Sequence, residues 1–338
     1  MKYYTTSYEE IISLENLLLA YKEFKKGKTK KKDMIEFEFN LMSNLIYLHN
    51  ELKNKIYKHD NYLHFKINDP KARDIHKAKV KDRVLHHAIY RKLYPFFDKA
   101  FISDSYSCRN DKGTHKALKQ FEKYTRKESK NYTRQCYILK CDIQKFFANI
   151  DHNILLSILN KKILDKDIIY LLKNIIESFN TKEKLEKGLP LGNLTSQLLV
   201  NIYMNEFDQF VKHTLKVESY IRYADDFVFI NKDKICLEKL KYQIADFLKQ
   251  ELKLNLHPDK VFIKTIYSGI DFLGFIYFAK HKVLRTNTKR RMLRKLKEND
   301  FKKESLDSYF GLLKFGNTFK IQSKIKKEMA ILVIEEKF

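Results

Sequence analysis

The chain has little of what makes a protein flexible, cross-linked or membrane-bound. Only 8 glycines and 4 prolines occur in 338 residues, which leaves little sequence for flexible linkers and favours one compact unit. The four cysteines form no CxxC pair, so a structural zinc site is not expected. No apolar run reaches the roughly eighteen residues that span a bilayer, and the start, MKYYTTSYEE, lacks a hydrophobic core for export. We therefore expect a reduced, cytoplasmic setting and no membrane partner.

Acidic residues are scarce relative to basic ones. The chain has 42 Asp and Glu against 67 Lys and Arg, a net charge of +25. Repulsion among the excess positive charges disfavours a compact fold, so a polyanionic partner is predicted. A hydrophobic fraction of 44% favours a globular protein over a disordered basic chain. The basic residues are interspersed with 21 Tyr and 25 Phe. That mixture favours a nucleic-acid groove over an acidic membrane surface.

Apolar periodicity predicts helices first, then mixed strands and helices, then helices again. Residues 135–143, QCYILKCDI, alternate in character, so Lys140 and Asp142 face one side of a strand. Ser13 is predicted as the N-cap and Gly27 as the stop of the first long helix. This order predicts an α+β core between helical flanks. Helices are expected within residues 13–28, 37–57, 79–101, 152–163, 167–179, 188–211 and 237–252, and short strands around 260–267 and 270–278.

Two adjacent carboxylates interrupt the apolar stretch SYIRYADDFVFI, residues 219–230. The flanking runs predict a β-hairpin, with Asp225 and Asp226 at its tip. A solvated turn is one interpretation, because Asp favours turns. Magnesium is the other, because it relieves the repulsion between carboxylates, and Asp142 at the end of the alternating strand is the candidate third acid. Two ions held in this way stabilise the attacking and the leaving oxygen in phosphoryl transfer.

Several blocks resemble a reverse transcriptase over nearly the whole chain, in the order of that family. YADD, with CDIQKFFANIDH upstream and GLPLGNLTSQLLVNIYMN between them, resembles the palm. KARDIHKAKVKDRV and SYSCRNDKGTHKAL resemble the fingers, and LNLHPDKVFI and DFLGF resemble the two blocks after the catalytic hairpin. A single YxDD motif is weak evidence for a family, whereas several blocks in the family's order are specific evidence. The resemblance implies an α+β right-hand polymerase with helical fingers (1–137), an antiparallel palm (138–278) and a short helical thumb (279–338).

The resemblance also implies which residues are catalytic. Asp142, Asp225 and Asp226 match the aspartates that bind two Mg²⁺ ions, for which Mn²⁺ can substitute. The backbone carbonyl of Ile143 is implied as a further metal ligand. Lys260 matches the lysine that protonates the departing pyrophosphate.

A second set of residues is implied to hold the incoming nucleotide. Arg73 and Lys79 match fingers residues that bind the triphosphate, for which a guanidinium fork and an ammonium are suited. Phe147 matches the aromatic floor of the sugar pocket, where a bulky ring leaves no room for a 2′-hydroxyl. Leu191 and Gly192 match residues beside the nucleotide.

A third set is implied to contact template and primer. Tyr223 precedes the aspartates, and Leu273 and Gly274 fall in the primer-grip turn. The thumb segment NTKRRMLRKLKEN places like charges four residues apart, which destabilises a helix unless a phosphate backbone lies alongside. Its contacts should be independent of sequence and sensitive to salt. The basic residues concerned are Arg290, Arg291 and Arg294.

The block LPLGNLTSQ departs from the usual family pattern. Most reverse transcriptases have Gln before the glycine and Pro after the serine, where this chain has Leu191 and Gln197. This version resembles enzymes of diversity-generating retroelements, which copy a template RNA with errors at adenines. A Gln amide would enforce pairing geometry, whereas Leu packs without hydrogen bonds and tolerates a misfit, so we predict that Leu191 lowers fidelity. The implied partners are RNA template, primer, dNTPs, a structured non-coding RNA and a small basic accessory protein.

Other functions fit the same blocks. Reverse transcriptases of retrons and antiviral defence systems share them and use a dedicated non-coding RNA, and Ala224 is common outside the diversity-generating group. A catalytically idle RNA-binding protein with the polymerase shape is an alternative of another class. An RNA-dependent RNA polymerase is a further enzyme alternative. No ribonuclease H or endonuclease domain is expected, and the oligomeric state is left open.

Overall fold

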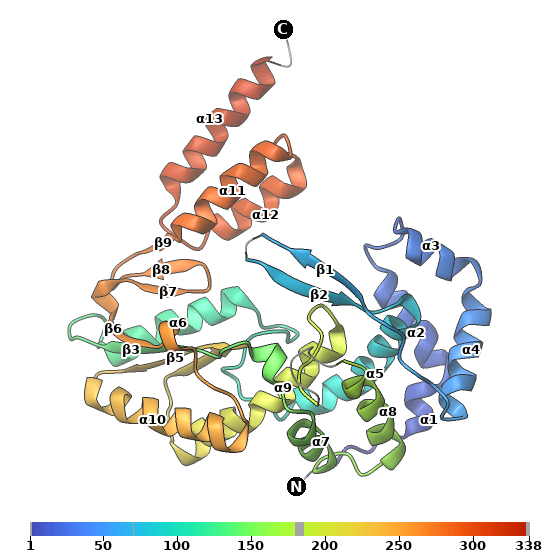
Figure 1. Cartoon of the computed structure of the whole chain (residues 1–338). Coiled ribbons are helices and arrows are strands. Elements are labelled where there is room, and N and C mark those ends of the chain that lie inside the picture. Colours follow the sequence, from blue (N-terminus) through green and yellow to red (C-terminus); the bar gives the residue numbers. More distant parts are fainter. Residues whose placement is uncertain (1, 70, 180–185, 336–338) are drawn as a thin grey trace.

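A computed structural model describes residues 2–69, 71–179 and 186–335 of the chain. N-terminal helices lie to the right of a central sheet, and C-terminal helices lie above it, at the top of the view (Figure 1). Ser13 caps α2, where its hydroxyl accepts from the Asn16 amide at 3.2 Å, as its sequence position predicts. The helices of the N-terminal part are α1 (Tyr8–Ile12), α2 (Leu14–Lys25), α3 (Lys32–Phe39), α4 (Leu41–Lys53), α5 (Val80–Asp98) and α6 (Thr114–Glu128).

A strand pair that the sequence pattern did not predict extends from these helices. Strands β1 (Leu63–Ile67) and β2 (Arg73–Lys77) pair antiparallel with Leu63 opposite Lys77. The hairpin reaches toward the C-terminal helices in Figure 1. All five residues of β1 are exposed, so this strand has no alternation between a buried and an exposed face. The prediction of helical fingers therefore omitted this hairpin.

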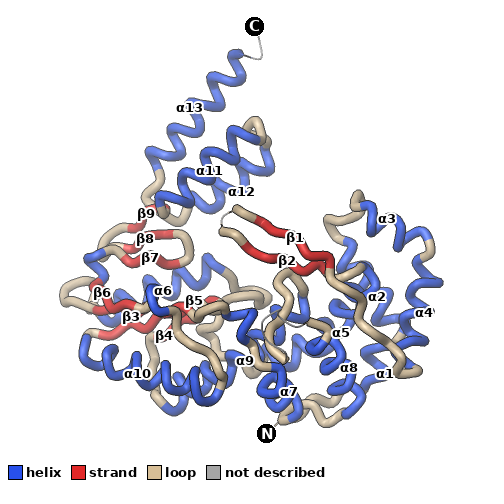
Figure 2. Tube along the Cα trace, in the orientation of Figure 1, coloured by secondary structure: helices blue, strands red, loops and turns tan. Residues whose placement is uncertain are grey.

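The central sheet separates two hydrophobic cores. Its strands are β3 (Tyr137–Asp142), β4 (Tyr220–Tyr223), β5 (Asp226–Asn231) and β6 (Phe262–Thr265), all antiparallel in the order β4-β5-β3-β6 (Figure 2). Leu139 and Cys141 enter the core that the N-terminal helices, α9 (Leu194–Gln209) and α10 (Lys234–Glu251) complete. Ile138 enters the second core, with α6 and the C-terminal part. The predicted alternation of β3 is thus confirmed.

The C-terminal part combines a small sheet with basic helices. Met292 and Leu296 on the inner face of α11 are buried. On its outer face Lys295 and Arg294 lie 3.1 Å and 3.4 Å from Asp69, beside the tip of the β1–β2 hairpin. Among the described residues, no helix has both the length and the apolar character to cross a membrane. The remaining elements are α7 (His152–Asn160), α8 (Lys166–Glu177), β7 (Ile270–Phe272), β8 (Phe275–Tyr277), β9 (Lys282–Leu284), α11 (Thr286–Glu298), α12 (Lys303–Leu313) and α13 (Phe319–Glu335).

A buried ion pair holds the hairpin between β4 and β5. Arg222 donates to both carboxylate oxygens of Asp208 on α9, at 2.8 Å and 2.6 Å, and the two side chains are 1% and 0% exposed. The same guanidinium donates to the Ala224 carbonyl at 3.2 Å and to the Ser105 hydroxyl at 3.0 Å. Ala224 has a φ of 58°, a left-handed conformation that costs a non-glycine residue about 1 kcal/mol or more. The Arg222 contacts therefore stabilise a strained turn.

Arg222→Met should destabilise the fold by about 3–5 kcal/mol, because it removes the positive charge that pairs with the buried Asp208 carboxylate, which keeps the hydrogen bond from the Tyr220 hydroxyl at 2.8 Å. Urea unfolding measures the loss. Lys234→Met is the matched control: its exposed pair with Glu238, at 3.3 Å, is worth less than about 1 kcal/mol. Equal stability of the two variants would contradict the role given to the buried pair.

Candidate active site

The pairing of β3 with β5 brings the three predicted aspartates to one end of the sheet. Asp142, the last residue of β3, lies directly opposite Asp226, the first residue of β5. Asp225 precedes Asp226 in the tight turn after Tyr223. The Ile143 amide donates to the Asp225 carbonyl at 3.2 Å, which ties the turn to the chain leaving β3.

Two of the three carboxylates are each paired with a lysine. Lys260, in the 3-10 turn Pro258–Lys260, donates to Oδ1 of Asp142 at 3.0 Å. Lys140 of β3 lies 3.3 Å from Oδ2 of Asp226. No group of three acidic, histidine or cysteine side chains in the described ranges is gathered closely enough to hold a metal ion. The aspartates are therefore adjacent along the backbone while two of their side chains are paired with lysines.

Burial and nearby negative charge raise the pKa values of Asp225 and Asp226. Burial raises the pKa of Asp226 to about 6, with Asp142 and Asp225 adding to the rise and Lys140 opposing it. Burial also raises the pKa of Asp225, helped by the charge of Asp142. Oδ1 of Asp226 is buried and has no hydrogen-bond partner among the residues that the structure describes. Carboxylate oxygens are the ligands that a divalent cation such as Mg²⁺ prefers, so the donor type of these side chains suits such an ion, whereas their present arrangement does not gather three of them.

The predicted triphosphate residues lie on the fingers side. Arg73 is exposed at the start of β2, and its charge makes a small contribution against the rise that burial causes in the pKa of Asp225. Lys79 is the residue before α5, and it pairs with Asp60 at 3.2 Å. Arg73 thus has a weak electrostatic effect on one of the carboxylates, whereas Lys79 pairs with Asp60, which lies 19 residues earlier in the chain.

Phe147 follows β3 closely in the chain. It lies in the 3-10 turn Phe146–Asn149, which begins after Lys145 in a left-handed conformation with φ 44°. Its ring is half-buried and meets the Phe146 ring edge-on at 5.5 Å. Its carbonyl accepts from the Leu189 amide at 2.8 Å, which links this turn to the loop that contains the next predicted residues.

The Leu191–Gly192 loop lies against the β1–β2 hairpin. The Leu191 carbonyl accepts from the His76 amide at 3.3 Å. Gly192 has a φ of 103°, and a Cβ there would lie 3.3 Å from Cγ2 of Ile75. Glycine therefore suits both the backbone conformation and the close approach of β2.

The predicted template and primer residues are divided among three places. The Tyr223 hydroxyl accepts from the Thr114 hydroxyl at the start of α6, at 3.2 Å. Leu273 and Gly274, with φ 47° and 89°, form the two-residue turn between β7 and β8, where such hairpins require positive φ. The remaining predicted residues are on α11, where Arg290 is exposed, Arg291 is half-buried, and Arg294 pairs with Asp69 and Glu298.

Sequence reasoning missed two functional candidates, Lys140 and Arg222. Both lie within otherwise apolar strands, and both are buried. A charged residue at a core position of a strand was the available signal, because burial of a charge demands a specific partner. Their partners, Asp226 and Asp208, could not be read from the spacing.

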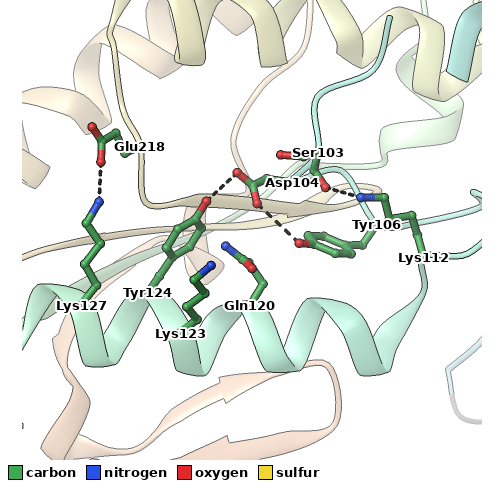
Figure 3. Close-up of a pocket in the computed structure, with 9 residues that line it drawn as sticks. All are labelled: Ser103, Asp104, Tyr106, Lys112, Gln120, Lys123, Tyr124, Lys127 and Glu218. Carbon is green, nitrogen blue, oxygen red and sulfur yellow. Dashed lines mark hydrogen bonds and ion pairs between the residues drawn. The ribbon is translucent and has the colours of Figure 1, made fainter. Parts of the chain in front are cut away.

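A cavity of about 710 Å³ lies away from the carboxylates, between the loop at Ser103 and α6 (Figure 3). The charged groups around it are largely paired with one another. Lys127 pairs with Glu218 at 2.5 Å, and Asp104 accepts from the Tyr124 hydroxyl at 2.8 Å (Figure 3). These contacts join α6 to the edge of the sheet, so we interpret the cavity as structural.

Comparison with known proteins agrees with this geometry. The family described as reverse transcriptase (RNA-dependent DNA polymerase) matches residues 56–277. Protein YkfC of Escherichia coli (strain K12) is 26% identical over 255 residues, which cover 65% of this chain and 65% of YkfC. The group II intron-encoded protein LtrA of Lactococcus lactis subsp. cremoris is 23% identical over 276 residues, covering 62% of this chain and 45% of LtrA. The chain thus spans about two thirds of one curated relative and less than half of the other.

Solved structures support the fold. Telomerase from Candida albicans, in complex with a TWJ fragment of telomeric RNA, aligns with a TM-score of 0.51 at 11% identity, over 70% of this chain and 48% of the telomerase chain. The mixture of helices and antiparallel sheets is that of an α+β right-hand polymerase. Because the family match spans more than half of the chain, the protein belongs to the reverse transcriptase (RNA-dependent DNA polymerase) family.

Proposed function

We propose that this protein synthesises DNA on an RNA template, by attack of a primer 3′-hydroxyl on the α-phosphate of a dNTP. The observation that supports this most is the pairing of Asp142 opposite Asp226, with Asp225 in the adjoining turn. Bound Mg²⁺ ions, or Mn²⁺ in their place, would neutralise the attacking and the leaving oxygen. RNA and dNTPs as substrates agree with a location in the cytoplasm of a prokaryote.

Metal binding, proton transfer and triphosphate binding are proposed for different side chains. Asp142, Asp225 and Asp226, with the Ile143 carbonyl, would hold the cations. Lys260 leaves Asp142 to meet the pyrophosphate, and its ammonium supplies a proton to that leaving group. Arg73 binds the triphosphate, since its charge already acts on the carboxylate site.

Asp225→Asn should abolish primer extension on an RNA template with Mg²⁺ while it leaves nucleic-acid affinity nearly intact, because one metal-binding carboxylate is lost. Extension is read on a gel and affinity by fluorescence anisotropy. Asp246→Asn, an exposed aspartate of α10, is the control that keeps activity. Near-normal DNA yield from Asp225→Asn would refute the metal role. No extension by the wild-type protein would favour the idle RNA-binding alternative.

Phe147 is proposed to exclude ribonucleotides, in keeping with its half-buried ring beside the end of β3. Phe147→Ala should lower the preference for dNTPs over rNTPs by roughly tenfold or more, because it opens room for a 2′-hydroxyl. Single-nucleotide incorporation with each substrate measures the ratio, and Phe39→Ala, an 87% exposed phenylalanine, is the control. A wild-type enzyme that prefers rNTPs would instead support an RNA-dependent RNA polymerase.

The biological setting we propose is a diversity-generating retroelement. Leu191 stands where a Gln amide would check pairing geometry, and its loop lies against β2, which contains Arg73. A structured RNA and a small basic accessory protein would then be partners, and the relative LtrA is named a group II intron-encoded protein. A retron or defence enzyme with its own non-coding RNA is the second candidate, which the Ala224 signature favours.

Leu191→Gln should reduce misincorporation opposite template adenines, because a side-chain amide restores a hydrogen-bonding check on the base pair. Sequencing of the cDNA from both enzymes measures the error rate at each template base. Leu164→Gln, at a 65% exposed leucine, is the control. An unchanged adenine error rate in Leu191→Gln would end the fidelity hypothesis.

A further inference from the structure

Lys140 connects a catalytic carboxylate to a second sheet. Its Nζ lies 3.3 Å from Oδ2 of Asp226 and donates to the backbone carbonyl of Asp271 at 2.7 Å. Asp226 begins β5 of the central sheet, and Asp271 is the middle residue of β7. The Lys140 side chain is only 11% exposed. A cation so buried is stable only where partners replace water, and these two oxygens are such partners.

The contacts continue from Asp271 to the thumb. The Asp271 carboxylate forms an ion pair with Arg285, the residue directly before α11. The Arg285 amide donates to the carbonyl of Gly274 at 3.0 Å, in the turn between β7 and β8. Arg285 thus holds the first residues of the thumb helix to the same hairpin that Lys140 contacts from the other side.

The two cations fix the β7–β8 hairpin in different ways. Lys140 binds a backbone carbonyl of β7, so it restrains the strand itself relative to β3. Arg285 binds the side chain of the same residue, so it restrains the thumb relative to the strand. An unbroken series of polar contacts therefore leads from Asp226 through Lys140 and Asp271 to Arg285. If the Leu273–Gly274 turn holds the primer, this series sets the distance from the primer end to the catalytic carboxylates.

We propose that Lys140 is a positioning residue that keeps Asp226 and the primer-holding turn in one fixed arrangement, with Arg285 extending that arrangement to the thumb. The inference rests on the proposed polymerase function. Lys140 transfers no proton and touches no substrate. Its loss should slow incorporation through misplacement of the primer terminus, and should leave the affinity for template–primer almost unchanged.

Single-turnover dNTP incorporation tests the proposal in Lys140→Met, Lys140→Arg, Arg285→Met and the double variant Lys140→Met/Arg285→Met. Lys140→Met should lower the rate by about 100-fold, the cost of a misplacement of about 1 Å. Lys140→Arg should recover part of the rate, since it keeps a charge and several donors. The double variant should be no slower than Lys140→Met, because the two residues act in series. Lys249→Met, exposed on α10 beyond the other face of the sheet, should match the wild type.

A second readout follows the primer directly. A fluorescent base analogue at the primer 3′ end should change its signal in Lys140→Met and in Arg285→Met, and not in Lys249→Met. Urea unfolding checks that each variant is folded. If Lys140→Met does not fold, Arg285→Met alone tests whether the contact series positions the primer, because Arg285 is 34% exposed and its replacement should disturb folding less. An unchanged primer signal there would then overturn the proposal.

These outcomes distinguish failure of the Lys140 positioning role from failure of the proposed polymerase function. An active wild-type enzyme whose Lys140→Met variant is equally fast overturns the positioning role alone. Rate losses that multiply in the double variant also overturn it, because they show independent action. An inactive wild-type enzyme instead removes the proposed function, whatever the primer signal shows.

Discussion

The register between β3 and β5 is the constraint on which the site depends. It places Asp142 opposite Asp226, and a slip of one residue would turn Asp142 to the opposite face of the sheet. Both faces of β3 are covered, with Leu139 in one core and Ile138 in the other. Any slip would therefore exchange residues between the two cores and bury the Asp142 carboxylate in place of an apolar side chain.

The end of the central sheet that contains the three aspartates has several features that cost stability and that its surroundings offset. Asp225 and Asp226 are harder to ionise than ordinary carboxyls, and Ala224 is left-handed. Such features persist only where neighbouring contacts define the conformation. Arg222 supplies these contacts from beneath the turn, and Lys140 supplies charge beside Asp226. The conformation of the turn and the charge of Asp226 are thus stabilised by residues that lie beside the turn and not in it.

Sequence reasoning predicted the elements that have a strong apolar period. The alternation of β3 and the hairpin at Asp225 both follow from local spacing. The β1–β2 hairpin was missed because β1 has no buried face, so no period of two marks it.

What the sequence could not predict are contacts between distant segments. Lys140 and Asp271 are 131 residues apart, and nothing in either strand indicates that they meet. The contact of Asp69 with Lys295 likewise depends on how the β1–β2 hairpin and α11 approach each other. A charge inside an apolar strand indicates that a partner exists, whereas only the tertiary fold shows which residue it is.

The proposed reaction depends on three acids that share one cation site. Cleavage of the protein chain by a redox-active cation bound at that site tests this sharing most directly. Fe²⁺ with ascorbate and peroxide generates hydroxyl radicals at a site that otherwise holds Mg²⁺. We expect cuts at two places far apart in the sequence, beside Asp142 and in the turn at Asp225, and excess Mg²⁺ should suppress both. Cuts at only one of these places, or cuts that Mg²⁺ does not suppress, would contradict a shared site.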